Sequence, residues 1–443
     1  MDKYHDRFTP ARVLVLGFAL LIIAGAVLLT LPVATHTSIN FLDALFTATS
    51  AVCVTGLVVV DTGTFFTRFG QIVILFLIQI GGLGFMTAGT VIFIVLGRKI
   101  SLKERLIIQE ALNQFTLAGL IRLTKSIILL TLILEGIGAL FLSFRFIPLF
   151  GWGTGIYYSI FHAVSAFCNA GIDLMGNFRS LTPFTYDYMV TGTILSLLIL
   201  GGLGFTVLVE VHEKRKFKTL SLHSKIVLAT TLFLLLFGTL VILLLESNNA
   251  ETLGSMGFIP KLVNTFFTAA TPRTAGFNVL PTDKLRDTTL YFIIALMFIG
   301  ASPASTGGGV KTTTFSAIMI TVLSIIRGNE EVFIFRKRLS FNIVNKALSI
   351  IVISIIIIFS ISIFLTITER AVFLGILFET MSAFGTVGLS TGLTTDLSPL
   401  GRLLIIITMF TGRVGPLTLT LALAERLKRK APFRYPEERI LVG

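Results

Sequence analysis

Four short segments that each end in glycine recur along the chain at nearly even intervals. They read Ser50-Ala-Val-Cys-Val-Thr-Gly56, Ser165-Ala-Phe-Cys-Asn-Ala-Gly171, Ala270-Thr-Pro-Arg-Thr-Ala-Gly276 and Ser382-Ala-Phe-Gly-Thr-Val-Gly388. The glycines are 115, 105 and 112 residues apart, and an apolar run precedes each segment. Self-similarity at a fixed period indicates a repeat architecture. We therefore expect four copies of one structural unit.

The last three residues of each segment are candidate selectivity-filter residues of a cation pore. A dehydrated cation needs several carbonyl oxygens facing one axis in place of its water shell. Glycine adopts the unusual backbone dihedral angles that this requires without a steric penalty. One such loop cannot surround an ion, so four together predict a pore. The candidate filter segments consist of Val54, Thr55 and Gly56; Asn169, Ala170 and Gly171; Thr274, Ala275 and Gly276; and Thr386, Val387 and Gly388.

The composition is that of a protein that crosses the membrane many times. The chain is 54% hydrophobic and 13% charged, whereas soluble proteins are roughly 25% charged. Apolar runs of about 20 residues or more predict spanning helices. We expect an all-α polytopic membrane protein with a pseudo-fourfold central pore, eight spans and four re-entrant pore loops. The first run, from Val13 to Val33, is too long for a signal peptide.

Each predicted unit contains a span, a half-buried segment that is too short to cross the membrane, a filter and a second span. The units cover residues 1–110, 111–217, 218–335 and 336–425, followed by a cytoplasmic tail at 426–443. First spans are expected at about 13–35, 124–148, 223–246 and 341–368. Pore segments are expected at 41–51, 156–167, 260–271 and 372–383, and second spans at about 68–97, 186–210, 287–327 and 400–425.

The positive charge is distributed unevenly between the two sides of this topology. The net charge is +13, and 25 of the 36 Lys and Arg residues fall on the side that carries both termini. The positive-inside rule therefore places both termini in the cytoplasm of a cell-membrane protein. This distribution argues for a lipid bilayer as partner and against a nucleic acid. The basic residues Arg336, Lys337 and Arg338 and the run from Arg426 to Lys430 are candidate contacts to an anionic lipid or protein surface.

Glycine-rich stretches recur in the second spans, about 24–30 residues after each filter glycine. In the first two, Gly81-Gly-Leu-Gly84 and Gly201-Gly-Leu-Gly204 are interpreted as sites of close helix packing. The third, between Gly300 and Gly309, combines a proline with three consecutive glycines and predicts an unwound loop below the filter. This loop is not a nucleotide-binding loop, because Val310 separates its glycines from Lys311. Arg413 in the fourth span is expected to face a cavity.

Other polar residues predict no catalytic or metal site. Cys53 and Cys168 each precede a filter glycine by three residues, and are interpreted either as a disulfide pair or as two small buried residues. His36 and His162 are assigned to the outer ends of spans without a carboxylate partner. Three acidic residues follow the filters and fit either a negative outer mouth or ordinary solvated loops: Asp61, Asp173 and Asp396. We expect neither an enzyme nor a cofactor in this chain.

Taken together, four span–pore–span units, one glycine per filter and a glycine-broken span in the third unit resemble the Trk/Ktr/HKT family of potassium transporters. The resemblance covers about residues 13–425, and the length and short loops look most like the bacterial Ktr membrane subunit. It implies potassium uptake through a pore with one filter per subunit. Since a serine at the first filter glycine accompanies sodium transport in plant relatives, Gly56 favours potassium. Only the fourth filter reads Thr-Val-Gly, so strict selectivity over sodium is less secure than permeation.

The resemblance also implies a gate and partners. The gate comprises a loop around residues 300–311, held shut with the help of an arginine; its residues are Ser305, Thr306, Gly307, Gly308, Gly309, Lys311 and Arg413. The implied partners are a second copy of the chain, as a homodimer, and a cytosolic ring of KtrA-like subunits that bind ATP or ADP. An alternative is the potassium-binding subunit of a P-type ATPase pump, which would be longer and have extra spans. A secondary transporter would instead show inverted repeats. Coupling to sodium stays open.

Overall fold

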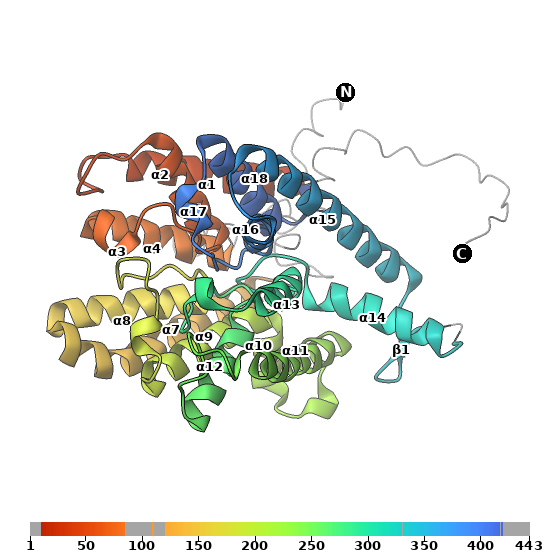
Figure 1. The fold of residues 1–443 in the computed structure, drawn as a ribbon. Coiled ribbons are helices and arrows are strands. Elements are labelled where there is room, and N and C mark those ends of the chain that lie inside the picture. The colour runs from red at the N-terminus through yellow and green to blue at the C-terminus, as the bar shows by residue number, and fades with distance from the viewer. Residues whose placement is uncertain (1–9, 85–108, 110–119, 330, 417, 420–443) are drawn as a thin grey trace.

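The computed structural model describes residues 10–84, 109, 120–329, 331–416 and 418–419. In this part of the chain almost all regular structure is helical. The exception is one antiparallel hairpin, in which β1 (Phe333–Ile334) pairs with β2 (Lys337–Arg338). Figure 1 shows the N-terminal helices beside the C-terminal ones in the upper half of the molecule, with the middle of the chain below them.

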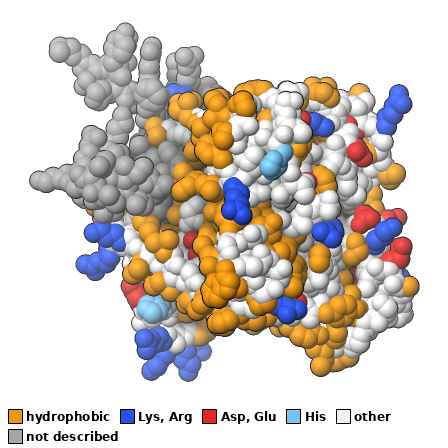
Figure 2. Space-filling model, turned by 90° about the vertical axis from the view of Figure 1, so that its left-hand side faces the viewer, with side chains coloured by type: hydrophobic (Ala, Val, Ile, Leu, Met, Phe, Trp, Pro, Cys, Tyr) orange, Lys and Arg blue, Asp and Glu red, His pale blue; other side chains and the backbone are white. Residues whose placement is uncertain are grey.

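Among the described residues, four long helices are apolar enough to cross a membrane, and the bent pair 188–203 and 205–214 could form a fifth span. The four long helices are α1 (Pro10–Leu29), α7 (Leu120–Phe150), α11 (Leu222–Glu246) and α15 (Phe341–Thr368). Large apolar side chains on these helices point outward, among them Leu20, Phe144, Leu244 and Phe359. Hydrophobic side chains also spread over the face drawn in Figure 2. Such a surface is unfavourable in water and suits contact with lipid.

A short helix follows each long one and ends at a filter segment. These pore helices are α2 (Phe41–Cys53), α8 (Trp152–Phe167), α12 (Phe258–Ala270) and α16 (Phe373–Gly385). Asn40 begins α2 by accepting a hydrogen bond from the backbone of Leu42. The helices α2 and α16 end where Val54 and Thr386 adopt left-handed backbone conformations. These two pore helices are thus terminated by the first residue of their filters.

The second helix of each unit is α4 (Arg68–Leu83), α9 (Tyr188–Leu203), α13 (Asp287–Phe298) or α18 (Pro399–Val414). Within the described ranges, the remaining helices are α3 (Thr62–Phe65), α10 (Phe205–Lys214), α14 (Thr312–Ile326) and α17 (Leu393–Asp396). The same ranges also contain three single 3-10 turns, η1 (Thr182–Phe184), η2 (Phe217–Thr219) and η3 (Thr282–Lys284).

The expectation that second spans 68–97, 186–210 and 400–425 are continuous is wrong where the structure describes them. Three of the second helices stop at a glycine with nearly the same backbone angles: Gly84 has φ 82° and ψ 131°, Gly204 has φ 95° and ψ 135°, and Gly415 has φ 93° and ψ 132°. These positive φ values are unfavourable for other residues. After Gly204 the chain continues as α10 at an angle of 96° to α9. The parts of the predicted spans at 85–97 and 420–425 lie outside the described residues, as does the tail at 426–443.

The four units close into a ring through their second helices. Each second helix contacts the pore helix of the next unit: α4 contacts α8, α9 contacts α12, and α13 contacts α16. The ring closes because α18 of the fourth unit contacts α2 of the first. Buried side chains fill the space behind the filters, including Phe46, Phe161, Phe267 and Phe378, one from each pore helix. This packing brings four segments that are about 110 residues apart in sequence to one centre.

Candidate functional site

The four filter glycines surround a single point at the centre of the ring. A Cβ atom on Gly388 would lie 2.2 Å from the Thr55 carbonyl oxygen and 2.9 Å from the Cα of Gly56. A Cβ atom on Gly171 would lie 2.6 Å from the Cα of Gly276. The backbone of other filters thus occupies the space that a side chain at a filter glycine would need. The structure brings all four predicted filter segments together.

The backbone alternates in the same way in every filter. The glycine has a positive φ in each case, from 64° at Gly171 to 96° at Gly56. The residue two positions earlier also has a positive φ, and these residues are Val54, Asn169, Thr274 and Thr386. For β-branched residues this conformation is a genuine outlier that persists only where the surroundings impose it. Alternating left-handed residues allow successive carbonyl groups to face the same way, as a selectivity filter requires.

In three units, a serine hydroxyl from the pore helix forms a hydrogen bond with the filter backbone, at the filter glycine or at the residue after it. The Ser50 hydroxyl accepts a hydrogen bond of 3.0 Å from the Gly56 N–H, and the Ser382 hydroxyl accepts one of 3.1 Å from the Gly388 N–H. The Ser165 hydroxyl instead donates to the Ile172 carbonyl over 2.6 Å. All three serines precede their glycine by six residues. Sequence reasoning did not assign these hydroxyls a role, although their equal spacing was a usable signal.

In the third unit, the residue that supplies the hydroxyl stands one position later in the sequence. Ala270 stands six residues before Gly276, and the neighbouring Thr271 supplies the hydroxyl, which donates to the Phe277 carbonyl. Arg273, where the first two units have cysteines, is buried behind the filter and donates to the Thr231 hydroxyl over 3.2 Å. The four filters are therefore alike in backbone and different in what supports them.

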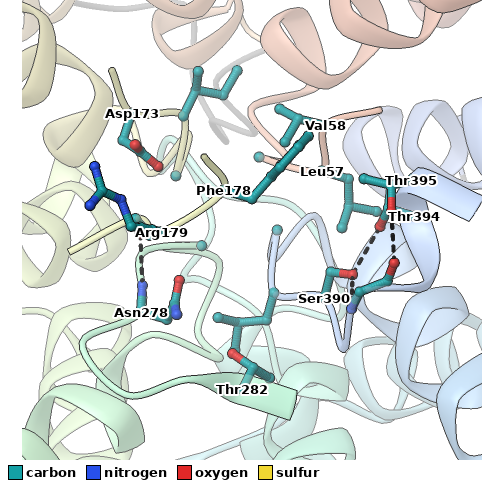
Figure 3. Close-up of a pocket in the computed structure, with 18 of the residues that line it drawn as sticks. Leu57, Val58, Asp173, Phe178, Arg179, Asn278, Thr282, Ser390, Thr394 and Thr395 are labelled. Atoms are coloured by element: carbon teal, nitrogen blue, oxygen red, sulfur yellow. Dashed lines mark hydrogen bonds between the residues drawn. The ribbon is translucent and has the colours of Figure 1, made fainter. Parts of the chain in front are cut away.

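Above the filter lies an open vestibule of about 570 Å³. The four filter glycines line its floor, and Figure 3 shows side chains from all four units around it. Three carboxylates line it, Asp61, Asp173 and Asp283, together with the guanidinium of Arg179. The exposed Asp396 is not among the lining residues. Of the three predicted outer acids, two therefore face the vestibule, and Asp283 is an addition that sequence reasoning missed.

The loop that interrupts the third unit's second helix lies directly beneath the filter. It connects α13 to α14 through residues 299–311. The Gly308 N–H donates to the Thr386 hydroxyl over 2.9 Å. A Cβ atom on Gly307 would lie 2.0 Å from the hydroxyl oxygen of Thr274. Thr274 and Thr386 are the first residues of the third and fourth filters, so the loop contacts the inner end of the pore.

Two basic side chains hold this loop. The Arg413 guanidinium donates to the Thr306 carbonyl and to the carbonyls of Gly81 and Gly82. The Lys311 ammonium donates to the Gly307 carbonyl over 2.6 Å. Arg413 therefore connects the loop of the third unit to the second helix of the first. Of the predicted gate residues, Gly307 and Gly308 lie against the filter through the contacts with Thr274 and Thr386. Gly309 lies against the fourth unit, because its N–H donates to the Gly412 carbonyl over 3.3 Å.

The remaining gate residues support the loop from the side. The Thr306 hydroxyl donates to the Phe167 carbonyl over 3.3 Å. Ser305 donates to the Ser302 carbonyl within the loop and does not contact a filter. Ser302 in turn donates its backbone N–H to the Gly202 carbonyl over 3.1 Å. The loop is thus hydrogen-bonded directly to the second and fourth units, and Arg413 links it to the first.

The glycine pairs that end the second helices pack against the pore helices, as their sequence suggested. A Cβ atom on Gly81 would lie 2.1 Å from the Val52 carbonyl oxygen, and one on Gly201 would lie 1.9 Å from that of Phe167. Gly412 stands in the same relation to Phe384, at 1.9 Å. Close packing is therefore one role of these glycines, and the end of the helix at the nearby glycine Gly84, Gly204 or Gly415 is a second feature that sequence reasoning missed.

Two cysteines and a histidine near the filters are buried in the structure. Cys53 and Cys168 are both buried free thiols, which settles the alternatives in favour of small buried residues. His162 does not lie at the outer end of a span; it is inside α8 and fully buried. Within the described ranges, no group of three or more His, Cys, Asp or Glu residues is placed to hold a metal ion.

Comparisons with known proteins agree with this geometry. The sequence matches the TrkH family, described as cation transport protein, over residues 6–435. It is 50% identical over 437 residues to the Ktr system potassium uptake protein B of Bacillus subtilis, covering 99% of this chain and 97% of that protein. It is 40% identical over 448 residues to the potassium/sodium uptake protein NtpJ of Enterococcus hirae, covering 100% of this chain and 99% of that protein.

A solved structure supports the fold independently. The potassium transporter TrkH from Vibrio parahaemolyticus aligns with a TM-score of 0.74 and 17% sequence identity, covering 96% of this chain and 87% of that one. At this identity the likeness concerns the fold alone. Together with the family match across nearly the whole sequence, it establishes that the chain belongs to the TrkH family of cation transport proteins.

Proposed function

We propose that this chain takes up potassium across the cell membrane through a gated, selective pore, as the ion-translocating subunit of a Ktr-type system. The observation that carries the proposal is the meeting of four glycine-ended segments with the same alternating backbone at one centre. Potassium is the substrate, and its ligands would be backbone carbonyls of the four filters. The protein would be a transporter and not an enzyme, with no cofactor in this chain. The relatives named above give no support to the alternative of a P-type pump subunit.

The membrane arrangement that fits this proposal is pseudo-fourfold. Each unit would contribute two spans and one re-entrant pore helix to a central pore. The closed order of helix contacts supports this arrangement. Irregular backbone at membrane depth is tolerated where it is buried in protein or lines an aqueous cavity, and the filters and the loop at 299–311 meet that condition. The positive-inside rule would put both termini in the cytoplasm.

We further propose that the loop at 299–311 is a gate in its closed position. Its hydrogen bond to Thr386 and its contact with Thr274 would block the inner end of the filter. The Arg413 guanidinium carries five donors and stays charged, so it can hold several loop carbonyls and repel an entering cation. Opening would require these hydrogen bonds to break together.

The proposed assembly is a bacterial homodimer docked on a KtrA-like ring, with ATP or ADP bound to the ring. The exposed hairpin of β1 and β2, which carries Arg336, Lys337 and Arg338, offers a basic contact surface. The second proposed basic contact, from Arg426 to Lys430, lies outside the described residues. Sodium dependence is a further part of the proposal, which the likeness to a potassium/sodium uptake protein supports.

Flux measurements in liposomes test the function. The purified protein should conduct potassium in preference to sodium, and a sodium gradient should alter potassium flux if the two are coupled. A protein that is folded and reconstituted but passes no potassium, with or without sodium and a regulatory ring, would overturn the proposal.

A further inference from the structure

Two buried polar side chains occupy equivalent positions on opposite pore helices. Glu379 on α16 precedes the filter glycine Gly388 by nine residues, and His162 on α8 precedes Gly171 by the same nine. Both side chains are completely buried. The second and fourth units are not neighbours in the ring of helix contacts, so the two residues lie on opposite sides of the pore.

Glu379 binds the stretch of chain that leaves the fourth filter. The Ser390 hydroxyl donates to one carboxylate oxygen, and the Thr394 hydroxyl donates to the other over 2.8 Å. Ser390 also accepts the N–H of Gly392 over 2.9 Å. Glu379 forms no ion pair within the described part of the chain; besides these hydroxyls, its carboxylate accepts backbone hydrogen bonds from Thr391 and Thr394. Because Ser390 and Thr394 line the vestibule, the buried carboxylate is one hydrogen bond away from the ion path.

His162 binds the corresponding stretch beyond the second filter. Its Nδ1 lies 2.7 Å from the Tyr158 carbonyl oxygen, which can only accept, so Nδ1 carries the proton. Its Nε2 is then free to accept the N–H of Leu174 over 3.3 Å. The ring is fixed by edge contacts with Phe146 and Phe161. A neutral imidazole thus holds the chain three residues past Gly171.

Pore-helix geometry explains why this one position reaches the outer end of the filter. From Glu379 to the end of α16 at Gly385 the helix descends about 9 Å, at roughly 1.5 Å per residue. The filter segment then runs in the opposite direction alongside the pore helix, with a more extended backbone. The residues just past the glycine therefore come level with the residue nine positions before it.

The other two units do not use this position. In the first unit Thr47 stands there, and its hydroxyl donates to the Asp43 carbonyl of its own helix over 2.9 Å. In the third unit Phe267 stands there and is buried. The chain beyond the third filter is held from the second unit instead, since the Thr185 hydroxyl donates to the Val279 carbonyl over 2.8 Å.

We propose that Glu379 and His162 are positioning residues that fix the outer ends of the fourth and second filters, so that ion discrimination depends on two opposite units. The inference rests on the proposed potassium pore and goes beyond it by assigning selectivity to residues that no ion touches. A filter end that is free to move accommodates a smaller ion more readily. Loss of either residue therefore lowers discrimination against sodium and leaves the pore open to potassium.

The experiment compares potassium and sodium flux through reconstituted variants in liposomes. Glu379→Leu removes both acceptor oxygens, and the ratio of sodium to potassium flux should rise by about threefold or more. Glu379→Gln keeps one acceptor oxygen and should show a smaller rise. His162→Phe should behave like Glu379→Leu. The control Thr47→Val changes the equivalent position of the first unit and should leave the ratio unchanged.

Pairs of changes separate positioning from general damage. Ser390→Ala combined with Glu379→Leu should add little to Glu379→Leu alone, because the Ser390 hydroxyl has already lost the carboxylate as its acceptor. His162→Phe combined with Glu379→Leu should multiply the two effects, because the residues share no partner. If Glu379→Leu does not fold, Ser390→Ala and Thr394→Val test the same bonds from the other side.

The outcomes distinguish this inference from the proposed function. Wild-type protein that conducts no potassium would overturn the pore itself. A selective wild-type pore whose Glu379, Ser390, Thr394 and His162 variants keep the wild-type flux ratio would overturn only the positioning role. An equal shift in Thr47→Val would likewise overturn it, since general loosening of the pore helices would then suffice.

Discussion

The backbone N–H of Gly308 donates a 2.9 Å hydrogen bond to the hydroxyl of Thr386, which joins the broken helix of the third unit to the first residue of the fourth filter. Thr386 has a left-handed backbone conformation that a β-branched residue adopts only under constraint. The same residue thus sets the direction of a filter carbonyl and holds the loop beneath it. This bond therefore couples movement of the loop to the conformation of the fourth filter.

Removal of the loop should open the pore. Deletion of residues 305–309 takes away the contacts with Thr274 and Thr386, and potassium flux in liposomes without a regulatory subunit should rise by about fivefold or more. Gly308→Ala is a milder variant, because its Cβ would lie 2.6 Å from the Thr386 hydroxyl oxygen. The matched control is Gly136→Ala, where a Cβ meets no atom within 4 Å. A folded deletion variant with lower or unchanged flux would make the loop a structural hinge or a part of the permeation site.

Arg413 should contribute a smaller share of the barrier. Arg413→Ala frees the carbonyls of Thr306 and Gly81, and basal flux should rise by about two- to threefold. Arg413→Lys keeps the positive charge, but an ammonium group cannot hold both carbonyls in the fixed fork of a guanidinium. The flux through Arg413→Lys should therefore lie between that of the wild type and that of Arg413→Ala. Wild-type flux in Arg413→Lys would assign the effect to charge repulsion alone. Wild-type flux in Arg413→Ala would remove the arginine from the gate.

Much of this arrangement was predictable because the pattern is local. The filter positions follow from glycine, whose unusual φ is required at the same place in four segments. The broken helix of the third unit follows from Pro303 and three adjacent glycines, which no continuous helix tolerates well.

Other features were not predictable because they depend on contacts between distant residues. Gly84, Gly204 and Gly415 stand in apolar runs where a glycine is compatible with helix packing, and only the structure shows that the helices end there at φ values of 82–95°. The partners of Glu379 lie beyond the filter, 11 and 15 residues away. His162 is assigned wrongly from sequence because a lone histidine in an apolar stretch does not indicate whether it lies at a helix end or in the buried interior of a pore helix.

The basic hairpin should mediate contact with a regulatory partner. Reversal of Arg336, Lys337 and Arg338 to glutamate should release a co-purifying regulatory subunit by making the surface acidic. Pull-down from membranes and nucleotide-dependent flux measure the effect. The control reverses Lys284 and Arg286, which are also exposed but border the vestibule side of the protein. Unchanged co-purification and regulation after reversal at the hairpin would leave only an attraction to anionic lipid.

Potassium uptake should depend on the ionisation of Asp173 in the loop beyond the second filter. Burial, together with the nearby Asp61, raises the pKa of Asp173 to about 6 against the opposing hydrogen bond from the Met175 N–H. The carboxyl group is therefore neutral below about pH 6 and negative above it. A negative vestibule concentrates cations, so uptake at subsaturating potassium should rise by about twofold between pH 5 and 7.

Asp173→Asn should remove this dependence on pH, and the exposed control Asp396→Asn should retain it. Flux measured across the same pH range in all three proteins gives the comparison. A wild-type response that survives in Asp173→Asn would assign the titration to another group.

The central claim is that four glycines form one potassium-selective filter, and Gly388→Ser tests it most directly. Its Cβ would lie 2.2 Å from the Thr55 carbonyl oxygen of the first filter, and a side chain at φ 91° costs about 1–3 kcal/mol. Gly151→Ser controls for that strain, because Gly151 has φ 78° and no atom within 4 Å of an added Cβ. The decisive measurement is the ratio of sodium to potassium flux in liposomes. The account predicts a raised ratio and weaker potassium affinity in Gly388→Ser alone; wild-type affinity and flux ratio in a folded Gly388→Ser protein would contradict it.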